Sequence, residues 1–317
     1  MSQDVSVIMP ARNVAATLER SVRSVLAEPE VLELIVVEDG SDDNTQQILE
    51  RLRDEDARLV IVKGGNLGVT KGVNRGLQEA KGRYFARCDA DDWWKGNRLS
   101  WQRPFLEENP DYVAVTGGFS TVTEKGDFIA DMACEGAAYE QTGDLLNGDL
   151  RSHLCAMLVR MEAVRTLGGM REWFFSAQDL DMQCRLAELG RVWHDPIPVL
   201  SYTLHDGSIT HTLGNQRRLF YQHAASTFAR QRRDTGADDL MRGAPPELIT
   251  SDMAETKARS ADEHIADQYT GEGWRKIQSG ARWAGLVYLA RALRHDPGKI
   301  GRWRSLAAGV VKSLLRR

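Results

Sequence analysis

The chain has 317 residues and a formal net charge of −4, and 42% of its residues are hydrophobic and 27% charged. This composition is ordinary for a water-soluble protein, and the length allows one large α/β domain with an appendage. Four cysteines without C-x-x-C spacing argue against a zinc site or a disulfide framework and favour a reduced, cytoplasmic compartment. No apolar run approaches the ~20 residues that span a bilayer, and no signal peptide is expected.

The first hundred residues alternate between strand-like and helix-like patterns. Short runs rich in Val, Ile and Leu predict strands, and apolar residues at helical spacing predict the helices between them. Strands separated by helices of this length pair in parallel, with right-handed crossovers. The predicted strands cover residues 5–9, 32–37, 59–62 and 84–88, and helical patterns lie around residues 18–26, 48–52, 66–77 and after residue 97. Residues 10–13 are expected to form a turn, and a further strand is expected at residues 155–159.

Each polar cluster in this region follows a predicted strand, at the edge where open α/β sheets bind ligands. The most informative cluster is Asp89-Ala90-Asp91-Asp92. A strand that ends in Asp-x-Asp places two carboxylates on one side, and paired hard oxygen donors suit a Mg²⁺ or Mn²⁺ ion that carries a diphosphate. An acidic turn in solvent is the alternative. The other polar clusters favour the metal site.

These clusters, in their order along the chain, resemble the motifs of a family 2 glycosyltransferase with the GT-A fold. The similarity runs from about residue 4 to about residue 212. It implies a Rossmann-like, mainly parallel sheet flanked by helices, to which this chain adds an α-helical C-terminal extension. The segments that carry the resemblance are Pro10-Ala11-Arg12-Asn13, residues 37–45, Asn66-Leu67-Gly68, Asp89-Ala90-Asp91-Asp92, Gly168-Gly169-Met170, residues 177–181 with Arg185, and residues 202–210.

The resemblance implies transfer of a sugar from a nucleoside-diphosphate sugar to an acceptor hydroxyl, with inversion at the anomeric carbon. The Asp39 carboxylate would accept a hydrogen bond from the ring N–H of the base. Helix capping is the alternative for Asp39, a common turn for Asn66 and Gly68, and an exposed lysine for Lys71. The implied donor-binding residues are Pro10, Ala11, Arg12, Asn13, Glu38, Asp39, Asn66, Gly68, Lys71, Asp89 and Ala90.

The resemblance also implies a divalent metal cofactor, Mn²⁺ or Mg²⁺. Asp91 would coordinate the metal directly, Asp89 would face the ribose or the metal's waters, and His205 would complete the site. The cation would act as a Lewis acid on the leaving diphosphate, and an acidic site needs a cation to attract a diphosphate. Asp92 is expected to cap a helix that begins near Trp94, or to position the sugar.

The acceptor side of the site requires a base for the acceptor proton. The resemblance implies Asp179 as this general base, because a carboxylate at a helix start can remove a proton. Gln178 stands where the family usually has Glu, so the chain lacks one carboxylate. Trp93 and His153 are further acceptor-side candidates. Asp181 and Arg185, spaced i,i+4, are expected to form a structural ion pair.

Three regions are expected along the chain. Residues 1–233 would form the catalytic domain, with a nucleotide-binding half of about 1–117 and an acceptor half of about 118–233. Residues 234–256 would be a linker, and residues 257–317 a basic helical region. Residues 1–216 contain 22 basic and 34 acidic residues, whereas residues 217–317 contain 19 and 11.

An amphipathic stripe in the terminal residues 299–317 allows two interpretations. The stripe could contact the inner face of the cell membrane. Alternatively, it could dock on the acidic catalytic domain, which is the favoured expectation. The acceptor would be a saccharide or a lipid-linked saccharide in cell-surface polysaccharide or glycoconjugate synthesis, and no nucleic-acid partner is expected. A sugar-nucleotide-binding protein with lost or altered transferase activity is the alternative function. The stripe consists of Ile300, Trp303, Ala307, Val310, Val311 and Leu314.

Overall fold

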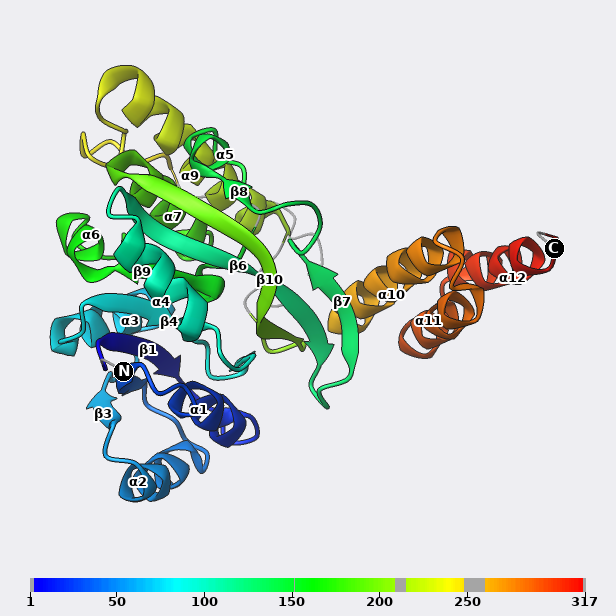
Figure 1. Cartoon of the computed structure of the whole chain (residues 1–317), viewed down its shortest axis with the longest axis horizontal. Coiled ribbons are helices and arrows are strands. Elements are labelled where there is room, and N and C mark those ends of the chain that lie inside the picture. Colours follow the sequence, from blue (N-terminus) through cyan, green and yellow to red (C-terminus); the bar gives the residue numbers. More distant parts are fainter. Residues whose placement is uncertain (1–2, 151, 209–214, 248–259, 316–317) are drawn as a thin grey trace. The chain divides into compact units, whose positions relative to one another are not determined.

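The computed structural model describes residues 3–150, 152–208, 215–247 and 260–315, and the chain divides into two compact units (Figure 1). The first unit comprises residues 1–119, 132–202 and 218–249. The second comprises residues 120–131, 203–217 and 250–317. Within the described ranges, every helix is too short or too polar to cross a membrane.

A ten-stranded sheet forms the framework of the fold. Eight of its strands follow the order β3-β2-β1-β4-β9-β6-β10-β5, while β7 pairs with β6 and β8 with β10. The first four strands in this order pair in parallel, as the βα pattern predicts, whereas β9 pairs antiparallel with both β4 and β6. The strands are β1 (Val5–Ala11), β2 (Val31–Glu38), β3 (Leu59–Lys63), β4 (Tyr84–Arg87), β5 (Trp93–Trp94), β6 (Tyr112–Thr123), β7 (Phe128–Met132), β8 (Tyr139–Glu140), β9 (Met157–Arg160) and β10 (Arg191–Leu204).

Helices cover both faces of this sheet in the first unit, because its central strands are apolar on both sides. In β1, Val5, Val7 and Met9 contribute to one buried cluster and Ile8 to the other. The first cluster includes apolar residues of α1, α2 and α4, and the second includes those of α3, α5, α6 and α7. The helices are α1 (Leu18–Leu26), α2 (Thr45–Glu55), α3 (Val69–Glu79), α4 (Leu99–Glu108), α5 (Thr142–Leu146), α6 (Met161–Thr166), α7 (Gln178–Leu189) and α9 (Asn215–Thr235).

The predicted α/β fold with C-terminal helices is confirmed, and three local predictions were wrong. Pro10 and Ala11 do not form a turn but continue β1, opposite Val37 and Glu38 of β2. The strand expected at residues 155–159 begins with a 3-10 turn, Leu154–Ala156, and only then becomes β9. Asp92 caps no helix, because the two tryptophans after it form the short strand β5 and α4 begins only at Leu99.

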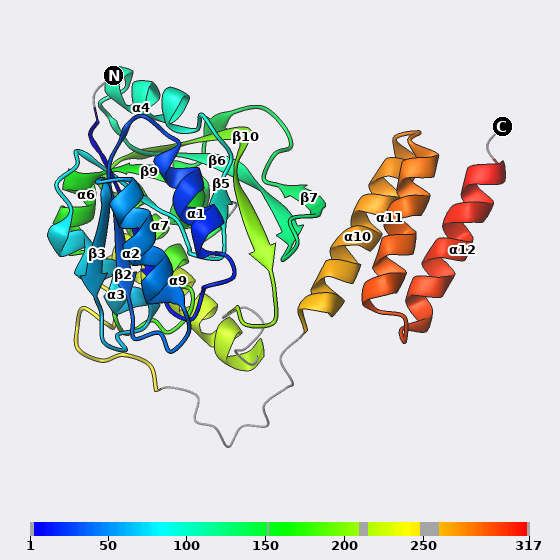
Figure 2. The same ribbon diagram turned by 90° about the horizontal axis from the view of Figure 1, so that it is seen from below.

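Three helices make up most of the second unit: α10 (Ala261–Gln278), α11 (Arg282–His295) and α12 (Ile300–Leu315) (Figure 2). A capping box starts α10, in which Ser260 and Glu263 each accept from the other's backbone N–H. Glycines bring α10 and α11 close together, since a Cβ at Gly273 would lie 2.8 Å from the side chain of Leu289. Of the segment expected as a linker, residues 248–256 lie outside the described ranges.

Candidate active site

The loops after β1 and β2 interlock through short hydrogen bonds. The Asn13 N–H donates to Ser41 Oγ at 3.0 Å, and the Asp42 N–H donates to Asn13 Oδ1 at 2.9 Å. Glu38 Oε1 accepts from the Ser41 N–H at 2.6 Å. Asn13 has a φ of 53°, a left-handed conformation that Asn adopts more readily than most residues. Two of the predicted donor-binding clusters therefore form one rigid rim at the sheet edge.

Asp39 connects this rim to the loop after β3. The side chain is 4% exposed, and its two oxygens accept from the N–H groups of Leu67 at 2.6 Å and Gly68 at 2.7 Å. Gly68 is the residue before α3, so Asp39 holds the start of that helix. Asp39 is not the cap of α2, because the residue before α2 is Asn44. The carboxylate still has lone pairs for a further donor. Nucleoside binding by Asp39 stays a prediction.

The remaining donor-side candidates are more exposed. Arg12 lies at the surface just after β1, and Asn66 lies exposed in a left-handed conformation with a φ of 67°. Lys71 is 53% exposed, and its Nζ lies 3.8 Å from a carboxylate oxygen of Glu172. That distance and exposure describe a loose surface ion pair, which leaves the lysine able to turn toward a phosphate.

The turn after β4 is held from two sides. Arg87, which is 4% exposed, donates from Nε to Asp89 Oδ1 at 2.7 Å. The Ala90 carbonyl accepts from Thr17 Oγ1 at 2.8 Å and from Ser21 Oγ at 2.9 Å. The first turn of α1 thus fixes the backbone between the two aspartates. Arg87 neutralises part of the acidic cluster.

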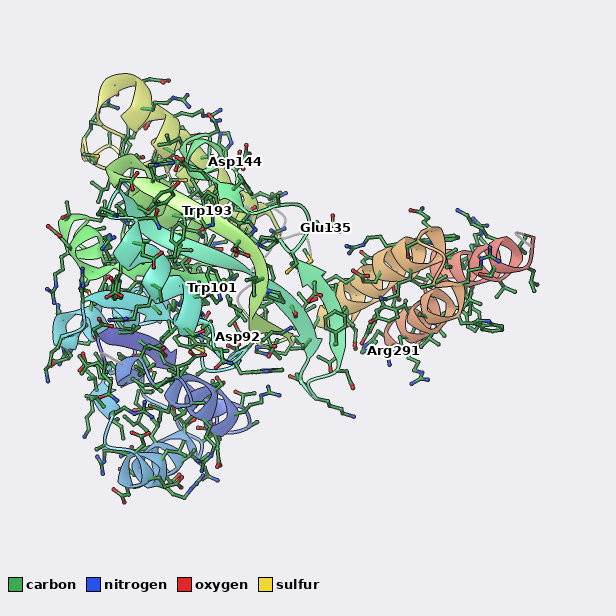
Figure 3. The ribbon with its side chains drawn as sticks, viewed as in Figure 1. Asp92, Trp101, Glu135, Asp144, Trp193 and Arg291 are labelled. Carbon is green, nitrogen blue, oxygen red and sulfur yellow. The ribbon has the colours of Figure 1, made fainter. Side chains whose placement is uncertain are left out.

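The acidic turn fits a hydrated divalent cation. Asp91 is partly exposed, Asp89 has one oxygen beyond the one bonded to Arg87, and Asp92 is fully buried (Figure 3). No group of three or more His, Cys, Asp or Glu side chains placed to hold a metal occurs in the described ranges. Mg²⁺ usually keeps several waters and binds through one or two carboxylates plus substrate phosphates, so the donors at this turn suffice.

His205 belongs to the second unit, and its part in a metal site stays a prediction. It directly follows β10, and the next residue is anchored: Asp206 Oδ1 accepts from the Ala261 N–H at 2.7 Å, at the first residue of α10. The closing segment predicted at residues 202–210 is described only up to Ser208.

Arginines cover the two tryptophans after the acidic turn. The Arg20 guanidinium carbon lies 3.6 Å from the ring centroid of Trp93, and that of Arg98 lies 4.3 Å from Trp94. Trp94 is 3% exposed and belongs to the hydrophobic core, whereas Trp93 is only partly buried. A sugar could stack on Trp93 only at the ring face that Arg20 leaves uncovered.

Asp179 lies partly buried in the first turn of α7, where its Oδ1 accepts from the Leu180 N–H at 2.9 Å. The helix follows Ala177, which has a left-handed φ of 59°, a costly conformation for a residue with a Cβ. Burial alone would lower the pKa of Arg87, but the negative charges of Asp89 and Asp179 outweigh it and raise that pKa. Asp179 therefore lies close enough to the β4 end to act on the same guanidinium.

Of the other acceptor-side candidates, Gln178 is buried and His153 is partly buried. Gln178 is 8% exposed, and its Oε1 has no hydrogen-bond partner among the described residues. The His153 ring centroid lies 5.0 Å from that of Tyr202 and 6.0 Å from that of Phe119. Both roles stay predictions.

The second aspartate of α7 is structural, and its predicted pairing is confirmed. Asp181 is 0% exposed, and its Oδ2 accepts from Arg185 Nε at 2.9 Å. Arg171 binds the other oxygen of Asp181 and reaches Asp238 at 2.7 Å. Asp238 also pairs with Arg232 of α9, so a buried charge cluster joins α7 to α9 and to part of the segment expected as a linker.

The sequence prediction missed Arg87, Arg171 and Asp238. Arg87 could have been found, because it lies two residues before Asp89 at the end of one strand, where alternate side chains point to the same side. Arg171 and Asp238 carried no such signal, since 67 residues separate the partners.

Comparison with known proteins identifies a family and several relatives of this chain. The sequence model described as Glycosyl transferase family 2 matches residues 6–167. An uncharacterized glycosyltransferase of Haemophilus influenzae is 30% identical over 244 residues, which cover 72% of this chain and 71% of that protein. The putative teichuronic acid biosynthesis glycosyltransferase TuaG of Bacillus subtilis is 31% identical over 53% of this chain and 70% of its own.

A further relative is named for a lipid-linked acceptor, and a solved structure has a similar fold. The Escherichia coli UDP-Glc:alpha-D-GlcNAc-diphosphoundecaprenol beta-1,3-glucosyltransferase WfaP is 31% identical over 44% of this chain and 61% of its own. The structure of S. aureus TarS 1–349 in complex with UDP-GlcNAc aligns with a TM-score of 0.61 at 16% identity, over 98% of this chain and 88% of that one. At this identity the structural match concerns the fold alone.

Proposed function

The chain belongs to glycosyl transferase family 2, and we propose that it transfers a sugar, with inversion, from a nucleoside-diphosphate sugar to an acceptor hydroxyl. The observation that carries the proposal is the meeting of four loops at one sheet edge. Asp39 joins the loops after β2 and β3, Ser41 joins those after β1 and β2, and Arg87 interacts with both Asp89 and Asp179. The binding sites for the nucleoside, the diphosphate and the acceptor would thus lie next to one another.

A UDP-sugar is the donor that we propose. WfaP uses UDP-Glc according to its name, and TarS has been crystallised with UDP-GlcNAc. The Asp39 carboxylate, with two backbone N–H donors already fixing its position, would accept from the ring N–H of uracil. The backbone of Pro10 and Ala11 continues β1 toward the same edge and would line the base or ribose.

We propose that the enzyme depends on Mn²⁺ or Mg²⁺. Asp91 would hold the ion directly, with Asp89 on its waters or on the ribose. A bound divalent ion supplies Lewis-acid stabilisation of the charge on the leaving diphosphate. Arg87 and the α1 hydroxyls would keep the turn in place as that charge develops, because they hold Asp89 and the Ala90 carbonyl before substrate arrives.

Asp179 would take the proton of the acceptor hydroxyl. It is partly exposed, whereas Asp181 is enclosed by arginines and has no access to substrate. The acceptor that we propose is a saccharide or a lipid-linked saccharide of a cell-surface polysaccharide, as the names of TuaG and WfaP suggest.

One observation favours a second function, a sugar-nucleotide-binding protein without transfer. Gln178 replaces a carboxylate that the family usually has, and its buried Oε1 lacks a hydrogen-bond partner in the described structure. Both functions need the donor site, but only the first needs Asp179 as a base.

A thermal-shift panel followed by a turnover assay tests the proposal. UDP, GDP, dTDP and CDP sugars are compared with and without Mn²⁺, because a ligand that binds only the folded state raises the melting temperature with occupancy. We expect a UDP-sugar to give the largest, Mn²⁺-dependent shift, and release of UDP to follow when acceptor is added. A shift without any hydrolysis or transfer would favour the binding protein, and no shift with any sugar nucleotide would refute both.

A further inference from the structure

The apolar stripe of α12 lies on the face of the helix that points away from α10 and α11. Ile300 is 68% exposed, Trp303 57% and Leu314 70%. The opposite face is enclosed, since a Cβ at Gly309 would lie 2.6 Å from the side chain of Leu289. The remaining stripe residues, Ala307, Val310 and Val311, are exposed as well.

Polar contacts fix this orientation of α12. Arg302, only 6% exposed on the side of the bundle, forms an ion pair with Asp267 and donates to Thr270 Oγ1 at 3.0 Å. Trp303 Nε1 donates to the Pro297 carbonyl at 3.0 Å, which satisfies the indole N–H while the ring stays exposed. A helix packed only by its own apolar face would have the reverse arrangement, with arginine outside and tryptophan inside.

Positive charge predominates in the part of the chain that carries the stripe. Residues 275–317 contain eleven Lys and Arg but a single acid, Asp296. Lys299 and Arg304 lie exposed beside the stripe, and Arg294 lies on α11, which also carries the exposed side chains of Trp283 and Val287. A second copy of this face would bring like charges together, whereas an anionic surface would be attracted.

We propose that the exposed face of α12 docks on the surface of an anionic lipid bilayer. Tryptophan and aliphatic side chains enter the boundary between headgroups and acyl chains, and flanking lysines and arginines attract acidic headgroups. The α12 helix has 16 residues, and its polar bundle side remains bound to α10 and α11, so the contact is peripheral. The inference goes beyond the proposed function and does not depend on it.

Vesicle sedimentation of the full chain tests the proposal without an activity measurement. We expect the wild type to sediment with phosphatidylglycerol vesicles and not with phosphatidylcholine vesicles, and to be released at about 1 M salt, where the Debye length is ~3 Å. The variant V311E/L314E should lose at least about tenfold in bound fraction, because two inserted apolar groups become acids. The matched control L219E/M241E changes two other exposed residues, 55% and 62% exposed, and should sediment like the wild type.

Three outcomes would overturn the proposal. The first is equal sedimentation of wild type and V311E/L314E, or sedimentation of neither. The second is a wild-type oligomer in lipid-free buffer that V311E/L314E dissociates, because the stripe would then bind a second copy. The third is a melting temperature of V311E/L314E well below that of L219E/M241E, because the stripe would then be covered by the protein itself.

Discussion

Two Asp-x-Asp segments in this molecule use their carboxylates in opposite order. In Asp89-Ala90-Asp91 the first aspartate is bound to a buried arginine and the second is partly exposed. In Asp179-Leu180-Asp181 the first is partly exposed and the second is enclosed by arginines. Sequence spacing alone does not distinguish the two aspartates of a segment. In the second segment, burial separates the structural Asp181 from Asp179, which can meet a substrate. In the first segment both aspartates are partly exposed, and Asp89 is the one bound to Arg87.

The largest effect is expected for Asp91, the partly exposed proposed metal ligand of the first segment. Asp91→Ala removes the proposed metal ligand, so we expect kcat/KM to fall by at least about 10²-fold, since a Lewis acid supplies several kcal/mol of stabilisation. Metal-dependent donor binding in the thermal-shift assay should disappear. The control Asp54→Ala removes a carboxylate that is 79% exposed and should be active. Full wild-type activity in excess EDTA would show that no metal is needed.

Replacement of Asp179, the partly exposed aspartate of the second segment, should lower the rate of transfer without weakening donor binding. Asp179→Asn keeps the size and the hydrogen-bonding oxygen but cannot take a proton, and loss of a general base costs ~10²–10⁴-fold in kcat. The donor dissociation constant, measured by calorimetry, should stay within about twofold. Glu162→Gln, an exposed neutralisation on α6, is the control. Near-normal turnover of the Asn variant would remove Asp179 from the mechanism.

Replacement of Asp181, the buried aspartate of the second segment, should mainly lower the free energy of unfolding. Asp181→Asn leaves Arg171 and Arg185 without their shared carboxylate in a buried site, and breaking a buried pair costs ~3–5 kcal/mol in the free energy of unfolding. Urea denaturation measures this change. As a contrast, Glu19→Gln in the exposed ion pairs between α1 and α2 should leave the denaturation midpoint unchanged within error. Equal midpoints for both variants would contradict the distinction between buried and exposed carboxylates.

The same buried cluster should make stability sensitive to acid. Burial alone would raise the pKa of Asp238, but the Met241 N–H and the guanidiniums of Arg232 and Arg171 outweigh it and lower that pKa. The stability from these contacts is therefore present above the unfolded pKa of about 3.9 and is lost as pH falls through the lower folded value. Asp238→Asn should flatten this part of the acid-unfolding curve. An unchanged curve would show that other carboxylates cause the acid sensitivity.

The surroundings of the first Asp-x-Asp segment were more predictable from the sequence than those of the second, for a physical reason. Polar residues at the ends of parallel strands meet at one edge, so the order of strands predicts that the loops after β1 to β4 come together. The antiparallel strand β9 and the charge cluster of α7 depend on contacts between residues far apart in the chain. Asp181 and Arg185 were predictable from i,i+4 spacing, whereas the partnership of Arg171 with Asp238 depends on how α9 packs.

The exposure of the α12 stripe was likewise not predictable from the sequence. Helical periodicity indicates that one face of α12 is apolar, but it does not indicate which face packs. The buried Arg302 and the close approach at Gly309 decide that orientation. An arginine enclosed by Asp267 and Thr270 overrides the usual preference for an apolar contact face.

The smallest effect is expected at Gln178, next to the available aspartate of the second segment. Gln178→Glu restores the carboxylate usual in the family at a site only 8% exposed, where desolvation favours the neutral acid. We therefore expect kcat at neutral pH to change by less than about tenfold. A neutral acid adds no charge beside Asp179, so the pH dependence of kcat should keep the wild-type shape. Gln178→Met, which also adds no charge, is the control and should show the same profile.

The result at Gln178 also decides between the two functions. If Gln178 is compatible with catalysis, the wild type is already active and Glu adds little to its rate. If instead the wild type binds donor but turns over only after Gln178→Glu, by a gain well above tenfold, then the missing carboxylate is the one that catalysis requires. Asp179 would then lose its role as the sufficient base, and the binding protein would become the better description of the chain. Steady-state kinetics of both variants across pH, with donor affinity measured in parallel, separates these cases because only the rate should differ between them.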